Sequence, residues 1–183
     1  MTDFISRIDK LWTLFLDRDG VINQRIVGGY VAEVSEFNFS PGVLESMSSF
    51  ATIFGRVVVV TNQQGIGKGL MTHHQLSEVH KFMITEIEAS GGRIDAVYYC
   101  SDLASVDNSC RKPSTFMANQ ARLDFPEIDF SKSIMVGDSV SDMEFGKACG
   151  MKTVFVQHNK SEGEIVADVC ISGLPELVRL IDV

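Results

Sequence analysis

Asp17 and Asp19 follow a short apolar run and are separated by a single residue. Residues i and i+2 of an extended chain point to the same side, so the two carboxylates can face one metal ion and one substrate. Hydrolysis of a phosphate ester needs an oriented nucleophile, a metal that screens the anionic oxygens and a proton donor for the leaving group. The pair could supply this chemistry, although Asp-x-Asp-Gly alone is also typical of a polar turn.

Later segments add groups that a phosphate site needs. Thr61 and Asn62 offer a hydroxyl and backbone N–H groups, and the glycine that follows lets the backbone approach a phosphoryl oxygen closely. Arg111 and Lys112 supply fixed positive charge. Asp138 offers a hard oxygen ligand of the kind that Mg²⁺ prefers.

Asp142 lies four residues beyond Asp138, near the start of a predicted helix. From there it could orient the waters of a metal ion or the side chain of Lys112. Each of these groups is more often structural than catalytic when it occurs alone. Their order along the chain, each after an apolar run, favours a shared site.

An apolar run precedes most of these polar segments, which is the pattern of strands buried on both faces. Strands are predicted at residues 11–16, 56–60, 96–99, 133–136, 152–156 and 169–171. Helices are predicted at residues 43–54, 72–89, 114–123, 141–148 and 175–181. The alternation predicts an α/β fold, a doubly wound (Rossmann-like) parallel sheet forming a single domain over residues 1–183.

Ligands bind outside the carboxyl ends of the strands in such a sheet, so the polar segments should meet at one edge. Residues 24–39 are too long for a simple connection and contain Gly28-Gly29-Tyr30. We therefore expect a flap or small hairpin beside that edge. No segment is long enough to form a separate cap domain. Within the second predicted helix, Thr72 and Gln75 have the spacing of a capping box.

The net charge of −8 argues against nucleic acid as a partner, because binding a polyanion normally takes a basic face. The same excess of carboxylates makes a small anionic substrate difficult to hold without a cation. Residues 1–12 lack the apolar core of a signal peptide, and no apolar run is long enough to span a bilayer. We expect a cytoplasmic protein with no membrane partner, and a monomer because the flap alone could cover the site.

The four cysteines are scattered, so reduced thiols are expected in a cytoplasmic protein. Only Cys100 and Cys110 form a pair that merits a closer look. The four histidines have no metal-ligand partner in the sequence and are expected at the surface or in packing: His73, His74, His80 and His158.

Taken in order, the polar segments resemble the four motifs of the haloacid dehalogenase-like (HAD) phosphatases. They read Asp17-Arg18-Asp19-Gly20, Thr61-Asn62-Gln63-Gln64-Gly65, Arg111-Lys112-Pro113 and Gly137-Asp138-Ser139. The particular residues of these motifs are similar to those of the capless subgroup, which contains heptose 1,7-bisphosphate and histidinol-phosphate phosphatases. The resemblance implies a HAD-like fold without a cap domain and the activity of a phosphoric monoester hydrolase.

The resemblance also implies roles for particular residues. Asp17 would be the nucleophile that forms an aspartyl-phosphate, and Asp19 the general acid and then the base that activates water. Thr61 and Lys112 would stabilise the transferring phosphoryl group. Mg²⁺ would be held by the carboxylate of Asp17, the backbone carbonyl of Asp19 and the carboxylate of Asp138.

The substrate implied is a small phosphorylated metabolite. Arg111 would contact the part of it that does not react, and Asn62 and Gln63 would line the same pocket. Arg25 and Lys68 could meet a second phosphate, which favours D-glycero-D-manno-heptose 1,7-bisphosphate losing its 7-phosphate. Histidinol phosphate and other sugar phosphates remain alternatives. A binding module without turnover is the alternative of another class, although no motif residue is missing.

The chain departs from the subgroup at its zinc loop. Relatives usually carry Cys-x-His followed by Cys-x-Cys before the Arg-Lys-Pro motif. Here residues 100–110 retain Cys100-Ser101-Asp102 and Ser109-Cys110, which leaves two thiolates and a poor third ligand. Structural zinc sites need four good ligands, so zinc is not expected.

Overall fold

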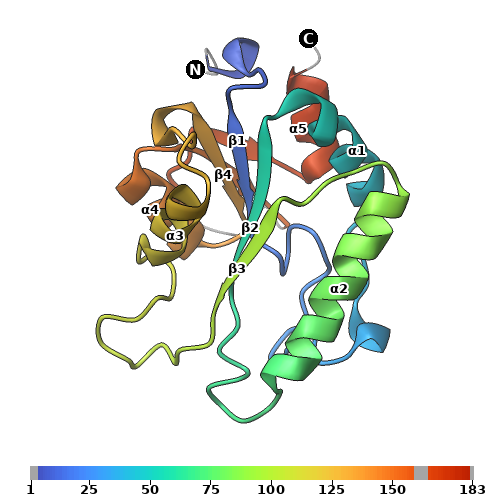
Figure 1. Ribbon diagram of the computed structural model, residues 1–183, viewed down its shortest axis with the longest axis vertical. Helices are drawn as coiled ribbons and strands as arrows, with labels where there is room; N and C mark the ends of the chain where they lie inside the picture. The colour runs from blue at the N-terminus through green and yellow to red at the C-terminus, as the bar shows by residue number, and fades with distance from the viewer. Residues whose placement is uncertain (1–3, 159–164, 182–183) are drawn as a thin grey trace.

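Within the part of the chain that the structure describes, six parallel strands form one sheet in the order β3-β2-β1-β4-β5-β6 (Figure 1). The computed structural model describes residues 4–158 and 165–181. The strands are β1 (Thr13–Leu16), β2 (Arg56–Asn62), β3 (Ala96–Cys100), β4 (Ser133–Gly137), β5 (Lys152–Val156) and β6 (Val169–Ile171). The predicted parallel α/β sheet is confirmed, with strand ends shifted by one or two residues.

The central strands are mostly apolar because helices cover both faces of the sheet. Side chains alternate between the faces of a strand. Leu14 and Leu16 of β1 therefore enter one core, whereas Phe15 between them enters the other. Neighbouring β2 repeats the alternation, and all of these side chains are fully buried. This two-sided burial fixes β1 and β2 at the centre of the protein.

Helices α1 (Val43–Ile53), α2 (His73–Ala89) and α5 (Leu174–Ile181) pack on one face, and α3 (Phe116–Asp124) and α4 (Val140–Cys149) on the other (Figure 1). Short 3₁₀ turns complete the described elements: η1 (Ile5–Arg7), η2 (Val34–Glu36) and η3 (Phe130–Lys132). In the part of the chain that the structure describes, no helix is long and apolar enough to cross a bilayer.

Two capping boxes fix where helices begin. The predicted box at α2 is present, with Thr72 Oγ1 accepting from the Gln75 backbone N–H and the Gln75 side chain accepting from the Thr72 backbone N–H. A second box starts α4, where the Ser139 and Asp142 side chains satisfy the first backbone N–H groups reciprocally. Such caps contribute about 1 kcal/mol. The second also holds Asp142 at the edge of the sheet.

Residues 24–39, the predicted flap or small hairpin, leave and rejoin the body of the domain through an isolated antiparallel bridge between Asn23 and Phe39. We call this segment the flap. The segment contains η2 and no strand, and its return is fixed where the Gln24 N–H donates to the Asn38 carbonyl at 2.8 Å. Phe37 and Phe39 anchor the return through edge and tilted ring contacts with Phe82 of α2. The opposite end of the flap is exposed at Val27.

Candidate active site

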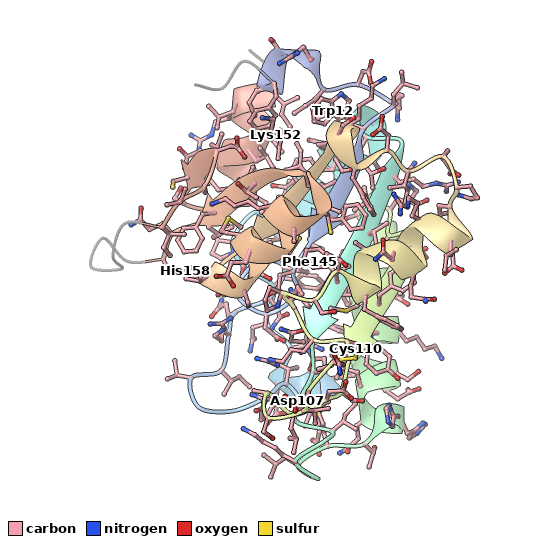
Figure 2. The ribbon with its side chains drawn as sticks, turned by 90° about the vertical axis from the view of Figure 1, so that its left-hand side faces the viewer. Trp12, Asp107, Cys110, Phe145, Lys152 and His158 are labelled. Atoms are coloured by element: carbon pink, nitrogen blue, oxygen red, sulfur yellow. A yellow bond between two sulfur atoms is a disulfide. The ribbon has the colours of Figure 1, made fainter. Side chains whose placement is uncertain are left out.

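Chemically capable side chains converge where β1, β2 and β4 end. Asp17 directly follows β1, Thr61 is the second-to-last residue of β2, and Asp138 directly follows β4. Figure 2 shows Trp12 and Lys152 at the opposite, amino end of the strands. A cavity of about 430 Å³ opens at the carboxyl end, bounded on one side by the flap. The predicted residues on its wall are Asp17, Asp19, Arg25, Thr61, Asn62, Arg111, Lys112 and Asp142.

Three buried carboxylates gather at this edge, and ligand oxygens of Asp17, Asp138 and Asp142 lie within 4.8 Å of one another. Burial raises the pKa of Asp17 to about 7; Lys112 opposes this rise, and the neighbouring carboxylates add to it. Burial likewise raises the pKa of Asp138 to about 6, against the attraction of Arg25. Crowded hard oxygen ligands that resist ionisation together form a donor set that suits a divalent cation such as Mg²⁺.

Gly20 permits this crowding. Its φ of +90° lies in the left-handed region, and a Cβ at this position would collide with the Asp138 carboxylate. The glycine of the Asp-x-Asp-Gly motif is therefore required by the approach of two loops.

Lys112 is the cation at the centre of the carboxylates. Its Nζ lies 2.8 Å from Asp17 Oδ1 and 2.6 Å from Asp142 Oδ1, and donates to the Val60 carbonyl at 2.7 Å. Burial lowers the pKa of Lys112, but the attraction of Asp142 and Asp17 outweighs it, so the pKa is raised. The lysine is therefore held as an ammonium group against the predicted nucleophile.

Asn62 positions the backbone that carries this lysine. Its Oδ1 accepts from the Lys112 N–H at 2.9 Å, and its Nδ2 donates to the Lys112 carbonyl at 3.3 Å. Asn62 reaches the cavity as expected, but sequence reasoning missed its anchoring role.

Arg18 is a further residue that sequence reasoning missed. Its side chain is fully buried, and Nη2 donates to both carboxylate oxygens of Asp19 at 2.8 Å. Burial alone would raise the pKa of Asp19, but Arg18, Asn23 and Gln63 outweigh it, so the pKa is lowered. The available signal was an arginine that closely follows a buried strand, because a buried guanidinium requires an anionic partner.

His80 completes the support of Arg18 from α2. Its Nε2 lies 3.3 Å from Arg18 Nη1. Burial and the neighbouring guanidinium lower the pKa of His80 to about 3, so the ring is neutral at physiological pH. The expectation that His80 serves packing holds, with a polar contact added.

Gln63 requires a correction. It was expected to line the cavity, but its side chain is fully buried behind the wall. Its Nε2 donates to Asp19 Oδ2 at 2.8 Å and to Thr61 Oγ1 at 2.9 Å. Gln63 therefore ties the end of β2 to the loop after β1.

Arg25 lines the cavity, but its guanidinium is paired with a carboxylate of this chain. Nη2 lies 2.8 Å from Asp138 Oδ1, and half of the side chain is exposed. His158, labelled in Figure 2, approaches the other Asp138 oxygen at 3.6 Å. A guanidinium and an imidazole thus lie at the carboxylate that was expected to bind metal.

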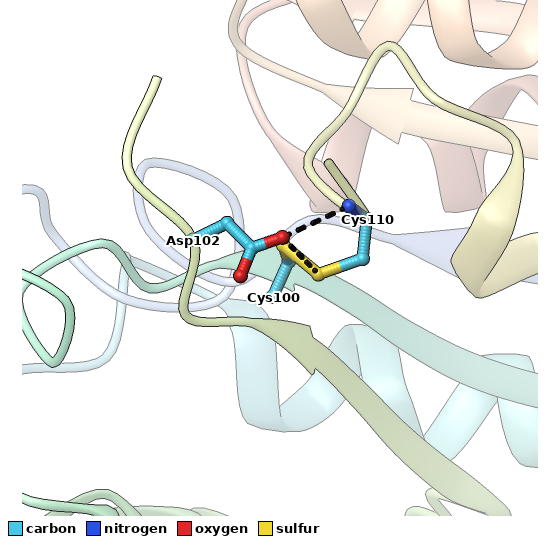
Figure 3. Close-up of side chains that lie close together, drawn as sticks. All are labelled: Cys100, Asp102 and Cys110. Atoms are coloured by element: carbon cyan, nitrogen blue, oxygen red, sulfur yellow. Dashed lines mark hydrogen bonds between the residues drawn. A yellow bond between two sulfur atoms is a disulfide. The ribbon is translucent and has the colours of Figure 1, made fainter. Parts of the chain in front are cut away.

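The expectation of four reduced cysteines is wrong for one pair. Cys100 and Cys110 are joined by a disulfide, whereas Cys149 and Cys170 are free thiols. Asp102, the residue expected to be a poor third zinc ligand, lies against the pair (Figure 3). Two sulfurs bonded to each other are not thiolate ligands, and the absence of zinc stays a prediction.

Comparisons with known proteins identify the family of this chain. Residues 109–176 match the HAD-hydrolase-like family model. The chain is 38% identical over 76% of its length to a D-glycero-alpha-D-manno-heptose-1,7-bisphosphate 7-phosphatase of Mycobacterium bovis, of which it covers 73%. It is 34% identical over 92% of its length to the corresponding beta-heptose enzyme of Haemophilus influenzae, of which it covers 95%.

A solved structure agrees. The D,D-heptose 1,7-bisphosphate phosphatase of B. bronchiseptica, complexed with magnesium and phosphate, superposes with a TM-score of 0.84. The two sequences are 26% identical, and the match covers 92% of this chain and 96% of the other. These similarities show that the chain belongs to the haloacid dehalogenase-like phosphatases.

Proposed function

We propose that this enzyme is a Mg²⁺-dependent phosphatase that hydrolyses a small sugar phosphate through an aspartyl-phosphate on Asp17. The contact between Asp17 and the Lys112 ammonium at 2.8 Å, within a buried carboxylate cluster, carries the proposal. A carboxylate with a purely structural role does not need a buried ammonium group beside it. A nucleophile that attacks an anionic phosphate does need such a compensating charge.

In the first step, an Asp17 oxygen bonds to phosphorus while the bond to the leaving oxygen breaks and Asp19 gives that oxygen a proton. In the second step, Asp19 takes a proton from water, whose oxygen attacks phosphorus and releases Asp17 and inorganic phosphate. Lys112 and the Thr61 hydroxyl face the phosphoryl oxygens. Mg²⁺, held by Asp17, Asp138 and the Asp19 carbonyl, would screen their charge.

The Asp19 carboxylate is hydrogen-bonded to Arg18, and its lowered pKa disfavours the protonated form that the acid step needs. The acid step therefore requires the carboxylate to turn from the guanidinium toward the leaving oxygen. The phosphate dianion of a bound substrate raises the carboxyl pKa and so promotes that exchange.

A heptose 1,7-bisphosphate is the substrate we favour, with the 7-phosphate removed. The Mycobacterium bovis relative is a 7-phosphatase of the alpha anomer, and the Haemophilus influenzae relative is a 7-phosphatase of the beta anomer. Around the cavity, Arg25, Lys68 and Arg111 offer positive charge for a second phosphate. A monomeric, cytoplasmic, single-domain enzyme remains a prediction, as does the absence of a nucleic-acid partner.

The test is phosphate release from both heptose anomers, fructose 1,6-bisphosphate, histidinol phosphate and p-nitrophenyl phosphate, each with Mg²⁺ or EDTA. We expect one equivalent of phosphate from one heptose anomer, with kcat/KM at least about 100-fold above histidinol phosphate. Phosphorus NMR should show the anomeric phosphate retained. Preference for histidinol phosphate would replace the substrate, and turnover that persists in EDTA would refute the metal dependence.

Without divalent cations, the free energy of unfolding should fall as the pH rises. The folded-state pKa values of Asp17 and Asp138, about 7 and about 6, lie above the unfolded value of 3.8, so the folded state binds these protons more tightly. In EDTA, their contribution to the free energy of unfolding should decline between pH 3.8 and about 7. Saturating Mg²⁺ should raise Tm by roughly 5–10 °C at pH 8, and by less at pH 5. Equal Mg²⁺ shifts at both pH values would contradict this, with NaCl of matched ionic strength as control.

Arg25→Gln should tighten Mg²⁺ binding. The half-exposed guanidinium neutralises Asp138, so its removal should lower the Mg²⁺ concentration for half-maximal activity by about two- to fivefold, the range of a screened ion pair. KM for a bisphosphate should rise in the same variant, because Arg25 faces the cavity. Lys132→Gln, an exposed position before β4, is the control. Weaker Mg²⁺ activation would show that Arg25 supports the site in another way.

A further inference from the structure

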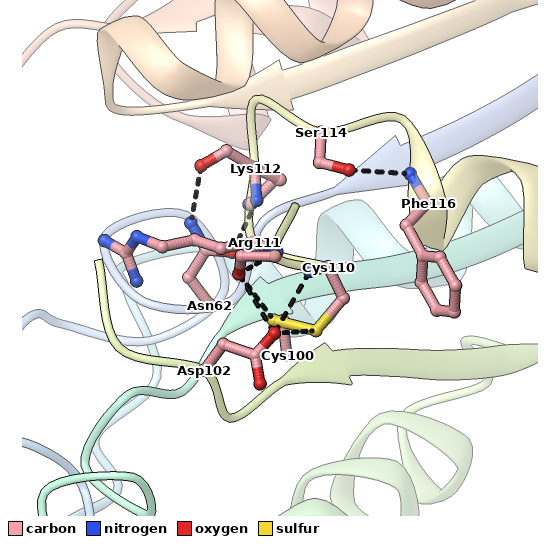
Figure 4. The surroundings of a disulfide bond; sticks show 9 residues. Asn62, Cys100, Asp102, Cys110, Arg111, Lys112, Ser114 and Phe116 are labelled. Carbon is pink, nitrogen blue, oxygen red and sulfur yellow. Dashed lines mark hydrogen bonds between the residues drawn. A yellow bond between two sulfur atoms is a disulfide. The ribbon is translucent and has the colours of Figure 1, made fainter. Parts of the chain in front are cut away.

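The Cys100–Cys110 disulfide joins the sheet to the segment that carries two cavity cations. Cys100 is the last residue of β3 and is fully buried, and its carbonyl accepts from the Gln63 N–H at 2.7 Å. Cys110 directly precedes Arg111 and is only half-buried. Figure 4 shows the bond beneath the backbone of this segment, with the Arg111 side chain extending away from it.

Asp102 adds a polar connection between the same two segments. Its Oδ2 accepts from the Ser109 hydroxyl at 3.0 Å and from the Cys110 N–H at 3.2 Å, and lies 3.3 Å from Cys110 Sγ (Figure 3). Ser109 Oγ in turn accepts from the Arg111 N–H at 3.0 Å. The backbone position of Arg111 therefore depends on residues adjoining the disulfide.

Arg111 and Lys112 differ in what else holds them. Lys112 is fixed through its backbone by Asn62 and through its ammonium by Asp17 and Asp142. Among the described residues, the Arg111 side chain lines the cavity without a hydrogen bond or ion pair, and its backbone N–H donates to Ser109 Oγ. Opening the disulfide should release Arg111 while Lys112 stays in place.

We propose that Cys100–Cys110 is a thiol–disulfide exchange site whose oxidised form holds Arg111 at the cavity, and that low-molecular-weight thiols or dithiols are its reductants. The oxidised enzyme binds substrate more tightly, and the reduced enzyme keeps its chemical step. The effect on substrate affinity rests on the proposed function, whereas the exchange site and the release of the loop do not.

The exchange balances with two thiols. A thiolate attacks Sγ of Cys110, the less buried of the two cysteines, which forms a mixed disulfide and expels Cys100 as a thiolate that takes a proton. A second thiolate attacks the small molecule's sulfur in that mixed disulfide and expels Cys110, which is also protonated. Two electrons pass to the protein, and the two small thiols leave as one disulfide.

The test begins with the untreated enzyme and the enzyme reduced by dithiothreitol. Alkylation under denaturing conditions should count two thiols before reduction and four after it. Reduction should lower Tm by roughly 5–10 °C, because an open loop is less constrained. Amide exchange should accelerate at Cys110 and Arg111, whose N–H groups bond to Asp102 and Ser109, and stay slow at Lys112.

Kinetics with the best bisphosphate substrate of the panel then test whether the disulfide affects substrate binding in the cavity. Reduction should raise KM about tenfold, the effect of losing one charged contact, and change kcat less than twofold. Cys110→Ala should have the KM and kcat of the reduced enzyme, and dithiothreitol should change neither. Cys170→Ala, a cysteine outside the pair, should behave as wild type.

Four thiols in the oxidant-equilibrated enzyme, or a stoichiometric zinc ion released by chelator, would overturn the proposal. It also fails if KM and amide exchange are unchanged by reduction. If thiol count and exchange respond as expected but no heptose phosphate is hydrolysed, the assigned substrate fails and the exchange site stands.

Discussion

Asp17→Asn should reduce kcat by roughly 10⁴-fold or more, the scale seen when a nucleophile is removed from a catalytic unit. An amide of the same shape cannot form the acyl phosphate. The fold should survive, because the variant removes a carboxyl whose pKa burial and neighbouring carboxylates raise to about 7. We therefore expect Tm in EDTA at pH 8 to be unchanged or higher than that of the wild type.

Acid quenching after mixing with ³²P-labelled substrate supplies a second readout. Labelled phosphate should remain on wild-type protein and be absent from the variant. Asp107→Asn, on the exposed loop, is the matched control and should retain full activity and labelling. Turnover of Asp17→Asn above about one per cent of wild type, after a check for deamidation, would show that another group attacks phosphorus.

Lys112→Met should lose both activity and stability. The substitution leaves the Asp17 and Asp142 carboxylates buried without their ammonium partner, which typically costs about 3–5 kcal/mol. For a chain of this size, Tm should fall by roughly 10 °C, measured in EDTA. kcat should fall at least about 100-fold, because the variant removes charge that faces the phosphoryl group.

The stability loss in Lys112→Met should depend on pH with a predictable sign. Lys112 lowers the pKa of Asp17, so its removal raises that pKa further above the unfolded value of 3.8. The variant should therefore be damaged less at pH 5, where the carboxyl groups protonate, than at pH 8. Lys81→Met, an exposed position on α2, should change neither Tm nor kcat. An equal loss of stability at pH 5 and pH 8 would indicate lost packing and not an uncompensated charge.

The sequence by itself determined the sheet and the edge that carries the site. Uninterrupted apolar runs such as β2 can be buried only between two helical layers, and their polar ends must meet because the strands are parallel. That local logic located Asp17, Thr61 and Asp138 correctly. It also located the capping box of α2, because such a box depends on residues three positions apart.

Only the tertiary structure decided which partners these groups take. Arg25 meets Asp138 across 113 residues of chain, Gln63 meets Asp19 across 44, and His80 meets Arg18 across 62. The Cys100–Cys110 bond likewise depends on how β3 lies against the returning loop. The periodicity of the sequence does not predict such pairs, because each joins segments that are distant in the chain. A buried guanidinium or amide bonds to the partner that packing brings within reach.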